Sequence, residues 1–208
     1  RGAEELGAVY FDLTEEQDLL QETVRQFATN VCTPSRRGAI FDGKDGHDTE
    51  LWHGLIEIGL GAIAVPDEFG GAGLELLDLA LAAEVLGAEA VPGPFLGHSL
   101  AGLAIAWAGS DAQKKSWLPK LASGELLGTI AFAEGDGHWQ PEQWAVTAGG
   151  ELHGAKTQVP FGAHGGLADF SARCGRLRRA AGARARRAVR SARYRHLALS
   201  TAAWLARP

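Results

Sequence analysis

The sequence predicts an α+β fold in which a helical N-terminal domain is followed by a β domain. Apolar residues recur every three to four positions through most of the first 122 residues, which is typical of amphipathic helices. A short run rich in β-forming residues follows at 126–133, and the two patterns are segregated along the chain rather than alternating. With 208 residues, of which 46% are hydrophobic, the chain is long enough to bury a sizeable core.

The first helix is predicted to begin after Thr14, which forms a capping-box pattern with Gln17 and is followed by acidic residues in the first turn. Its apolar residues lie four, three and four positions apart, on one face: Leu20, Val24, Phe27 and Val31. Pro34 is predicted to end this helix. Residues 35–47 are polar and contain Gly, so they are predicted to form a loop.

Two further helices are predicted in the middle of this part. Asp48 can cap a helix over roughly 49–58, which Gly59 and Gly61 would stop. A helix over about 75–89 is apolar almost all round, which is typical of a helix at the centre of a domain.

The next helix is predicted from another stripe with spacings of four, three and four: Leu96, Leu100, Leu103 and Trp107. Ser110 and Asp111 can cap a fifth helix over about 112–122, and Trp117-Leu118-Pro119 is predicted to pack and end a helix. After the strand at 126–133, the segments 144–147 and 151–153 flank a Gly-Gly pair and predict a hairpin.

The formal net charge of −5 conceals two oppositely charged parts. Residues 1–170 contain every Asp and Glu and carry −16, whereas 171–208 carry +11 from eleven Arg. Three interpretations of this tail stay open: a frame-shifted translation of GC-rich coding sequence, a basic arm for nucleic acid, and an Arg/Ala helix lying on the acidic body. The complete absence of Lys, Asp and Glu from the tail favours the first.

Several classes of protein and site are not supported. No apolar run approaches the ~18 residues that a membrane span needs, and Arg1 to Val9 shows no signal-peptide pattern, so a cytoplasmic location is expected. Cys32 and Cys174 cannot build a disulfide framework. The seven His show no i, i+4 pair and no Cys partner, so no metal site is predicted.

Four stretches together carry a resemblance to a known family. They are the opening helix from Leu13 to Phe27; Pro66-Asp67-Glu68-Phe69-Gly70-Gly71-Ala72-Gly73 with the helix that holds Ala83-Glu84-Val85-Leu86-Gly87; the run 108–125; and Glu151-Leu152-His153-Gly154-Ala155-Lys156.

In this order and spacing, the chain resembles the acyl-CoA dehydrogenase family over roughly 10–165. The resemblance implies an N-terminal helical domain over 10–124 and a partial antiparallel β-barrel domain over 125–170, which leaves 171–208 as an Arg/Ala-rich tail. We expect the chain to lack the family's C-terminal four-helix domain.

The resemblance also implies a chemistry. Family members are flavoproteins of fatty acid and lipid metabolism that desaturate an acyl-CoA between its α and β carbons. A carboxylate base removes the α proton, and FAD takes the β hydride before passing electrons to an electron-transfer flavoprotein or a similar acceptor. No residue here can be assigned as that base, so the chain is predicted to be a truncated oxidoreductase, inactive alone, that assembles into homo- or hetero-oligomers.

Two positions are candidates for contact with the flavin. The family commonly has Thr-Glu-Pro where this chain has Ala133-Glu134-Gly135, and Trp-Ile-Thr where it has Gln158-Val159-Pro160. Glu134 and Val159 are the matching positions, while the hydroxyls and the aromatic ring are replaced. Two alternative functions follow: a non-catalytic scaffold subunit of a mixed acyl-CoA dehydrogenase oligomer, or a nucleic-acid binder that uses the Arg-rich tail.

Overall fold

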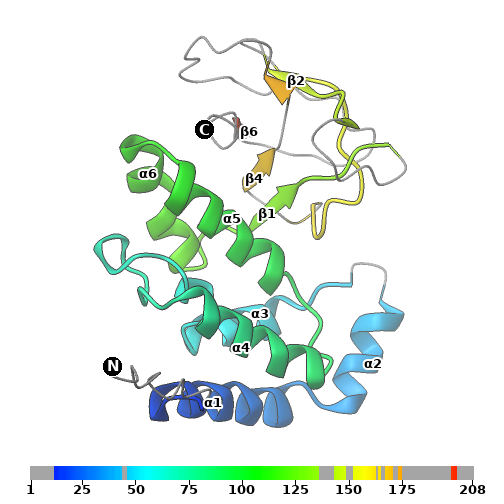
Figure 1. Cartoon of the computed structure of the whole chain (residues 1–208). Helices are drawn as coiled ribbons and strands as arrows, with labels where there is room; N and C mark the ends of the chain where they lie inside the picture. Colours follow the sequence, from blue (N-terminus) through cyan, green and yellow to red (C-terminus); the bar gives the residue numbers. More distant parts are fainter. Residues whose placement is uncertain are drawn as a thin grey trace, which may run out of the picture.

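The structure is a computed structural model in which a stack of helices lies below a smaller β part (Figure 1). It describes residues 12–43, 46–135, 143–148, 152–162, 164, 167–170, 173–174 and 198–200. The helices are α1 (Glu15–Val31), α2 (Pro34–Asp42), α3 (Thr49–Glu57), α4 (Leu76–Ala88), α5 (Phe95–Ala108) and α6 (Asp111–Ala122), with short 3-10 turns at Leu60–Ala62 and Asp67–Phe69. None of the described helices is long and apolar enough to cross a membrane.

Helix α1 begins as predicted. The Thr14 hydroxyl accepts a hydrogen bond from the Gln17 backbone N–H, and the Gln17 side-chain oxygen accepts one from the Thr14 N–H. The Gln17 amide also donates to a carboxylate oxygen of Asp78, 3.0 Å away in α4. One side chain therefore caps α1 and fastens it to α4, its main packing neighbour.

The predicted loop over 35–47 is wrong, because α2 occupies Pro34–Asp42. Pro34 does not interrupt a helix here; it is the first residue of one, where its missing N–H has no helical partner to lose. Thr33 caps this new helix through its hydroxyl. The prolyl residue thus separates two helices and starts the second.

The ends of α3 and α6 test two other predictions. Helix α3 starts after the Asp48 cap and stops before Gly59, whose φ is 88°. Helix α6 has the predicted Ser110 cap and ends at Ala122, which confirms the helix predicted over about 112–122, so Pro119 does not end it. Pro119 is exposed and lies in the last turn, where the loss of one backbone hydrogen bond is tolerated.

The two most apolar helices, α4 and α5, are each buried on one side and exposed on another. In α5 the stripe from which the helix was predicted includes Leu96 and Trp107, which are 57% and 61% exposed, whereas His98 and Ile105 are almost completely buried. Helix α4 is not covered all round, because its Leu76 is 54% exposed. Both helices are apolar on every side, so periodicity alone cannot say which side is buried.

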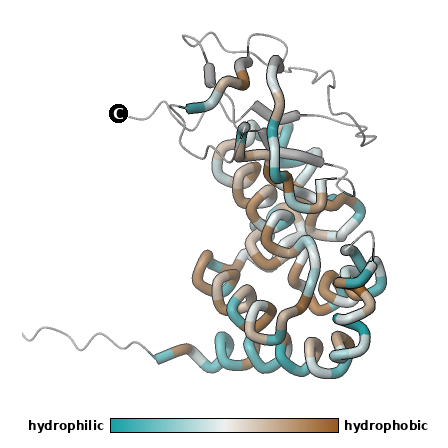
Figure 2. The backbone as a smooth tube through the Cα atoms, turned by 90° about the vertical axis from the view of Figure 1, so that its right-hand side faces the viewer, coloured by the Kyte–Doolittle hydropathy of each residue, from teal (hydrophilic) through white to brown (hydrophobic). Residues whose placement is uncertain are grey.

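The core lies between α1, α3, α4 and α5. Figure 2 shows hydrophobic residues concentrated in the inner helices, while α1 at the base carries mostly hydrophilic ones. The principal cluster contains buried aliphatic and aromatic side chains from these helices and the turn after α3: Val24, Trp52, Leu55, Leu60, Ile63, Leu79, Ala82, Val85, Leu86, Phe95 and Leu103.

The Gly-rich segment 70–73 before α4 forms a tight turn. Gly70 and Gly73 have positive φ angles of 80° and 64°. A Cβ on Gly71 would lie 1.9 Å from the Val65 carbonyl oxygen, so the backbone approach there requires glycine. The turn folds back on residues 62–65 through backbone hydrogen bonds and thereby forms one wall beside α5.

The β part begins with β1 (Gly128–Ala131) and contains the predicted hairpin, in which β2 (Thr147–Ala148) pairs antiparallel with β3 (Leu152–His153). The pairing of β1 differs from that in the predicted antiparallel barrel. β1 pairs in parallel with β4 (Leu167–Phe170), because the hairpin segment serves as a crossover between them.

Two short strands fall within the predicted tail. β5 (Arg173–Cys174) pairs in parallel with β2, and β6 (Ala198–Ser200) pairs in parallel with β4. The described strands thus make two three-stranded sheets, β1-β4-β6 and β3-β2-β5. The three interpretations of the tail concern mainly residues that lie outside those the structure describes.

Candidate functional site

Glu134, a candidate for contact with the flavin, forms a buried ion pair with Lys156 just after β1. The Lys156 ammonium nitrogen lies 2.7 Å from a Glu134 carboxylate oxygen, and the two side chains are only 2% and 5% exposed. The same nitrogen donates to the Phe132 carbonyl oxygen at 3.0 Å. Lys156 therefore joins the segment that leaves β1 to the segment that leaves β3.

The carboxylate of Glu134 has further donors. It accepts hydrogen bonds from the backbone N–H groups of Ala145 and Val146, which lie just before β2. The Trp144 ring covers the pair, with its centre 4.5 Å from the Lys156 nitrogen, and Phe132 meets that ring edge-on. Three chain segments thus converge on one enclosed pair.

Burial and hydrogen bonding act in opposite directions on the Glu134 carboxyl. Burial by itself raises its pKa, but the bonds from Lys156, Ala145 and Val146 outweigh burial and leave the pKa below its usual value. For Lys156 burial dominates and lowers the pKa, while Glu134 opposes that change. The three donors thus favour the ionised form of the Glu134 carboxyl.

The predicted Val159 position lies in a tight loop that the structure brings beside Glu134. Thr157 joins the two segments, since its N–H donates to the Ala133 carbonyl oxygen (2.9 Å) and its hydroxyl to that of Gly135 (3.0 Å). Val159 itself is half-buried, and the preceding Gln158 has a φ of 52°. Hydrogen bonds of Thr157 therefore connect the two segments that hold the candidate positions, and contact of Glu134 or Val159 with a flavin stays a prediction.

The polar groups of this site do not fit a flavin well. Ala133 has no polar side-chain atom, and Pro160 has no N–H, while its carbonyl oxygen already accepts the Thr129 hydroxyl at 2.6 Å. The Glu134 carboxylate and the Thr157 hydroxyl are engaged within the protein. The hydroxyls that the resemblance implies at the positions of Ala133 and Pro160 are therefore absent, while the exposed amide of Gln158 is a side-chain donor beside Val159.

One buried donor is left over in the same cluster. The indole N–H of Trp144 is buried and has no hydrogen-bond partner among the described residues. Trp144 was predicted only as part of the hairpin segment 144–147, where an aromatic residue is typical of a strand. Its position over Lys156 could be known only from the fold.

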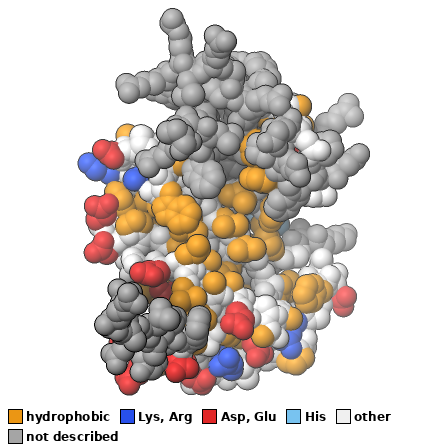
Figure 3. All heavy atoms as spheres, viewed as in Figure 1, with side chains coloured by type: hydrophobic (Ala, Val, Ile, Leu, Met, Phe, Trp, Pro, Cys, Tyr) orange, Lys and Arg blue, Asp and Glu red, His pale blue; other side chains and the backbone are white. Residues whose placement is uncertain are grey.

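A second feature is an apolar face on α4 and α5. Hydrophobic side chains are gathered across the middle of the molecule in Figure 3. Four leucines and one tryptophan of these helices and the turn before them are about half exposed or more: Leu74, Leu76, Leu77, Leu96 and Trp107. Exposed hydrophobic areas of this kind are typical of surfaces that contact another molecule.

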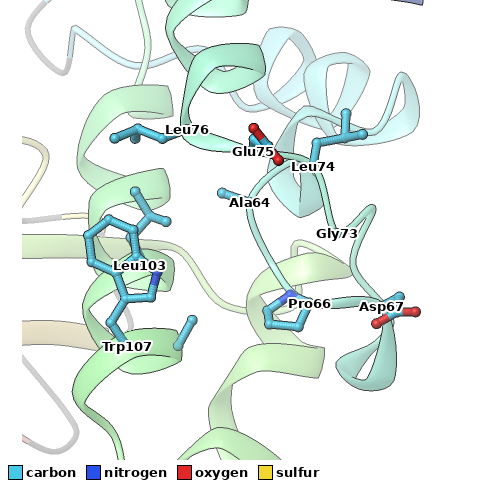
Figure 4. A pocket seen from close by; sticks show the side chains of 10 residues that line it. Ala64, Pro66, Asp67, Gly73, Leu74, Glu75, Leu76, Leu103 and Trp107 are labelled. Carbon is cyan, nitrogen blue, oxygen red and sulfur yellow. The ribbon is translucent and has the colours of Figure 1, made fainter.

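The apolar face contains a cavity of about 490 Å³. Leu103 and Trp107 of α5 lie on one side with Leu76 above them, and Pro66 and Gly73 of the turn before α4 lie on the other (Figure 4). Two carboxylic acid residues, Asp67 and Glu75, also line it. No Lys or Arg is among the lining residues, so the cavity suits an apolar group rather than an anion.

Known proteins match this chain mainly through its helical part. The family model described as "Acyl-CoA dehydrogenase, N-terminal domain" matches residues 14–125. "Acyl-CoA dehydrogenase IpdE2" of Mycolicibacterium smegmatis is 39% identical over 121 residues, which are 58% of this chain and 38% of that protein. "(2S)-methylsuccinyl-CoA dehydrogenase" of Cereibacter sphaeroides is 34% identical over 159 residues, which are 73% of this chain and 29% of that protein. The chain thus spans well under half the length of these relatives.

Solved structures agree with this match. A variant of the Tcur3481–Tcur3483 steroid ACAD has a TM-score of 0.70 and 32% identity, over 77% of this chain and 45% of that one. The ChsE4–ChsE5 complex from Mycobacterium tuberculosis has a TM-score of 0.68 and 28% identity, over 78% and 46%. An acyl-CoA dehydrogenase complexed with FAD from Bacillus anthracis has a TM-score of 0.67 and 25% identity, over 78% and 30%.

Proposed function

Because the chain belongs to the acyl-CoA dehydrogenase family, we propose that it is the N-terminal part of an oxidoreductase that desaturates an acyl-CoA between its α and β carbons. The observation that carries this proposal is the match of residues 14–125 to the family's N-terminal domain, together with the helices α1 to α6 that fill this range. The acyl-CoA substrate and an electron-transfer flavoprotein or similar acceptor follow from the family resemblance.

We propose further that this chain alone does not catalyse the reaction. A flavin, when bound, supplies the hydride acceptor of this chemistry. The described segments around Glu134 and Val159 would face it, yet the hydroxyls that the resemblance implies are replaced there by Ala133 and Pro160, and the Glu134 carboxylate is engaged within the protein. We assign no described carboxylate the role of the base.

Cys32 is a buried free thiol, which suits a reducing compartment such as the cytoplasm.

A second candidate function is that of a scaffold subunit in a mixed oligomer. Two observations favour it: the poor fit of the Glu134 site to a flavin, and the exposed apolar face on α4 and α5, which suits contact with another polypeptide. The ChsE4–ChsE5 structure shows that a protein with a similar fold forms a complex. In such an assembly the partner would supply the flavin contacts and the base.

Two measurements separate these candidates. The purified chain is mixed with acyl-CoA substrates of several lengths and an artificial electron acceptor, and its flavin content is read from visible absorbance. Turnover by the chain alone would contradict the proposed inactivity. The second measurement uses the chain co-purified with a family partner. If the chain contributes to the active enzyme, the complex should turn over acyl-CoA. If the chain is a scaffold, flavin should be found only on the partner.

A further inference from the structure

A group of neighbouring leucines is exposed where the Gly-rich turn enters α4. Leu74, Leu76 and Leu77 are 43%, 54% and 52% exposed. A leucine that is exposed singly needs no explanation, but apolar side chains that are exposed together are typical of a surface that another group covers. We call these three residues the α4 patch.

Helix α1 starts at the same end of the helical stack as α4. The Gln17 amide donates to Asp78 at 3.0 Å, and the Gln21 amide donates to Glu84 at 3.3 Å, so the two packed helices run in the same direction. Asp78 also accepts a hydrogen bond from the Glu75 N–H at 2.8 Å, at the start of α4. The chain therefore enters α1 beside the α4 patch.

The chain that precedes α1 has a composition that suits this patch. The described part begins at Asp12, and the six residues before it, Leu6 to Phe11, carry no charge. Three large side chains end this stretch, namely those of Val9, Tyr10 and Phe11. An extended chain spans about 3.3–3.6 Å per residue, so these three residues reach about 10 Å from Asp12. They are therefore long enough to cross the first turn of a neighbouring helix.

We propose that Val9, Tyr10 and Phe11 pack on the α4 patch and cover its leucines. Because this segment is attached to α1, its effective concentration at the patch is about millimolar, which favours it over a separate partner. A second copy of the chain is disfavoured, since residues 1–170 carry −16 and like-charged surfaces repel each other. The proposal concerns only the start of α4, leaves the apolar face around Trp107 to other partners, and does not depend on the proposed enzymatic function.

The test is limited cleavage of the full chain with chymotrypsin, which cuts after Tyr10 and Phe11 when they are accessible. The N-terminal peptides that are released are quantified by mass spectrometry. A packed segment must leave its site before it is cleaved, so the rate of release follows the fraction of open chain. In the double variant Leu74→Lys with Leu77→Lys, the charges oppose burial under apolar side chains, and we expect ~5–10-fold faster release than in the native chain.

Leu96→Lys is the matched control. Leu96 is 57% exposed, but it lies in the first turn of α5, which follows the end of α4 at Ala88, and so it is remote from Leu77 at the start of α4. This variant should release the peptides at the native rate. Equal release from the native chain and the double variant would overturn the proposal. A change in sedimentation of the double variant without faster release would also overturn it, and would assign the α4 patch to contacts between copies.

A second measurement leaves the α4 patch itself unchanged. Tyr10→Ser with Phe11→Ser removes the covering rings, so the leucines should bind more of the dye ANS, whose fluorescence rises on exposed hydrophobic surface. Val9→Ile, which keeps the segment apolar, should show the native fluorescence. Equal dye fluorescence in the native chain and the double serine variant would contradict the proposed packing.

Discussion

The Nδ1 atom of His98 accepts a hydrogen bond from the backbone N–H of Gly128, 3.2 Å away, and so joins α5 to the first strand. Its other ring nitrogen lies 3.2 Å from the Gly61 carbonyl oxygen, to which it donates. The ring is 1% exposed and meets the Trp52 ring edge-on. A neutral imidazole satisfies both bonds, whereas a protonated ring would lose the one from Gly128.

Stability should therefore fall in mildly acidic solution. Burial lowers the pKa of His98 from 6.5 to about 4. The unfolded chain takes up this proton before the folded one does, so the stabilising contribution is complete above pH 6.5 and is lost as the pH falls toward 4. The difference between the pKa values of the unfolded and folded chain corresponds to about 3 kcal/mol in the free energy of unfolding. The free energy of unfolding, measured with urea at pH 7, 5.5 and 4.5, should decrease as the pH falls, and the decrease should be clearly smaller in His98→Gln. An equal decrease in the native protein and the variant would contradict this account.

A second prediction concerns the ion pair between α2 and α3. The Arg36 guanidinium binds both carboxylate oxygens of Asp48, at 2.6 and 2.8 Å, and holds the pKa of that carboxyl at about 2. Asp48→Asn keeps an acceptor for the Leu51 N–H but loses the bidentate pair, so we expect a loss of ~1–2 kcal/mol in the free energy of unfolding. The exposed Glu50, 3.5 Å from Arg36, provides the control: Glu50→Gln should have little effect.

A third prediction concerns the buried pair of the candidate site. Lys156→Met leaves the Glu134 carboxylate buried without its cation, which should cost ~3–5 kcal/mol in the free energy of unfolding. Glu134→Gln with Lys156→Met removes both charges and should cost less than the sum of the single changes. The exposed pair Lys120–Glu125, 3.4 Å apart, is the matched control, and Lys120→Met should cost less than ~1 kcal/mol. Additive effects at the buried pair in a double-mutant cycle would contradict the coupling.

A fourth prediction concerns the apolar face. Leu76→Lys and Trp107→Lys each place a charge on a side chain that is more than half exposed, so the free energy of unfolding should change little. If this face contacts other molecules, the double variant should show less self-association than the native chain in sedimentation or light scattering. Lys114→Glu, away from the cavity lining, serves as a charge control. Unchanged self-association in the double variant would show that this face does not take part in the contact between chains.

The family resemblance and the starts of three helices could be predicted from the sequence, because capping is a local interaction. Thr14, Asp48 and Ser110 each bond to an N–H three residues away, and that spacing is visible in the chain itself. The hairpin of β2 and β3 is local in the same way. The chain segments around Glu134 and Val159 were identified only through the resemblance, and their roles stay predictions.

Only the tertiary structure decided which side of an all-apolar helix is buried, since α5 could have turned either face to the core. It alone paired Lys156 with Glu134, placed Trp144 over them and brought His47 to His164. These contacts join residues from 12 to 117 positions apart, and no short-range pattern encodes them. Caps and turns follow from neighbouring residues; the partners of buried charges and rings follow from how separate segments pack around a shared core.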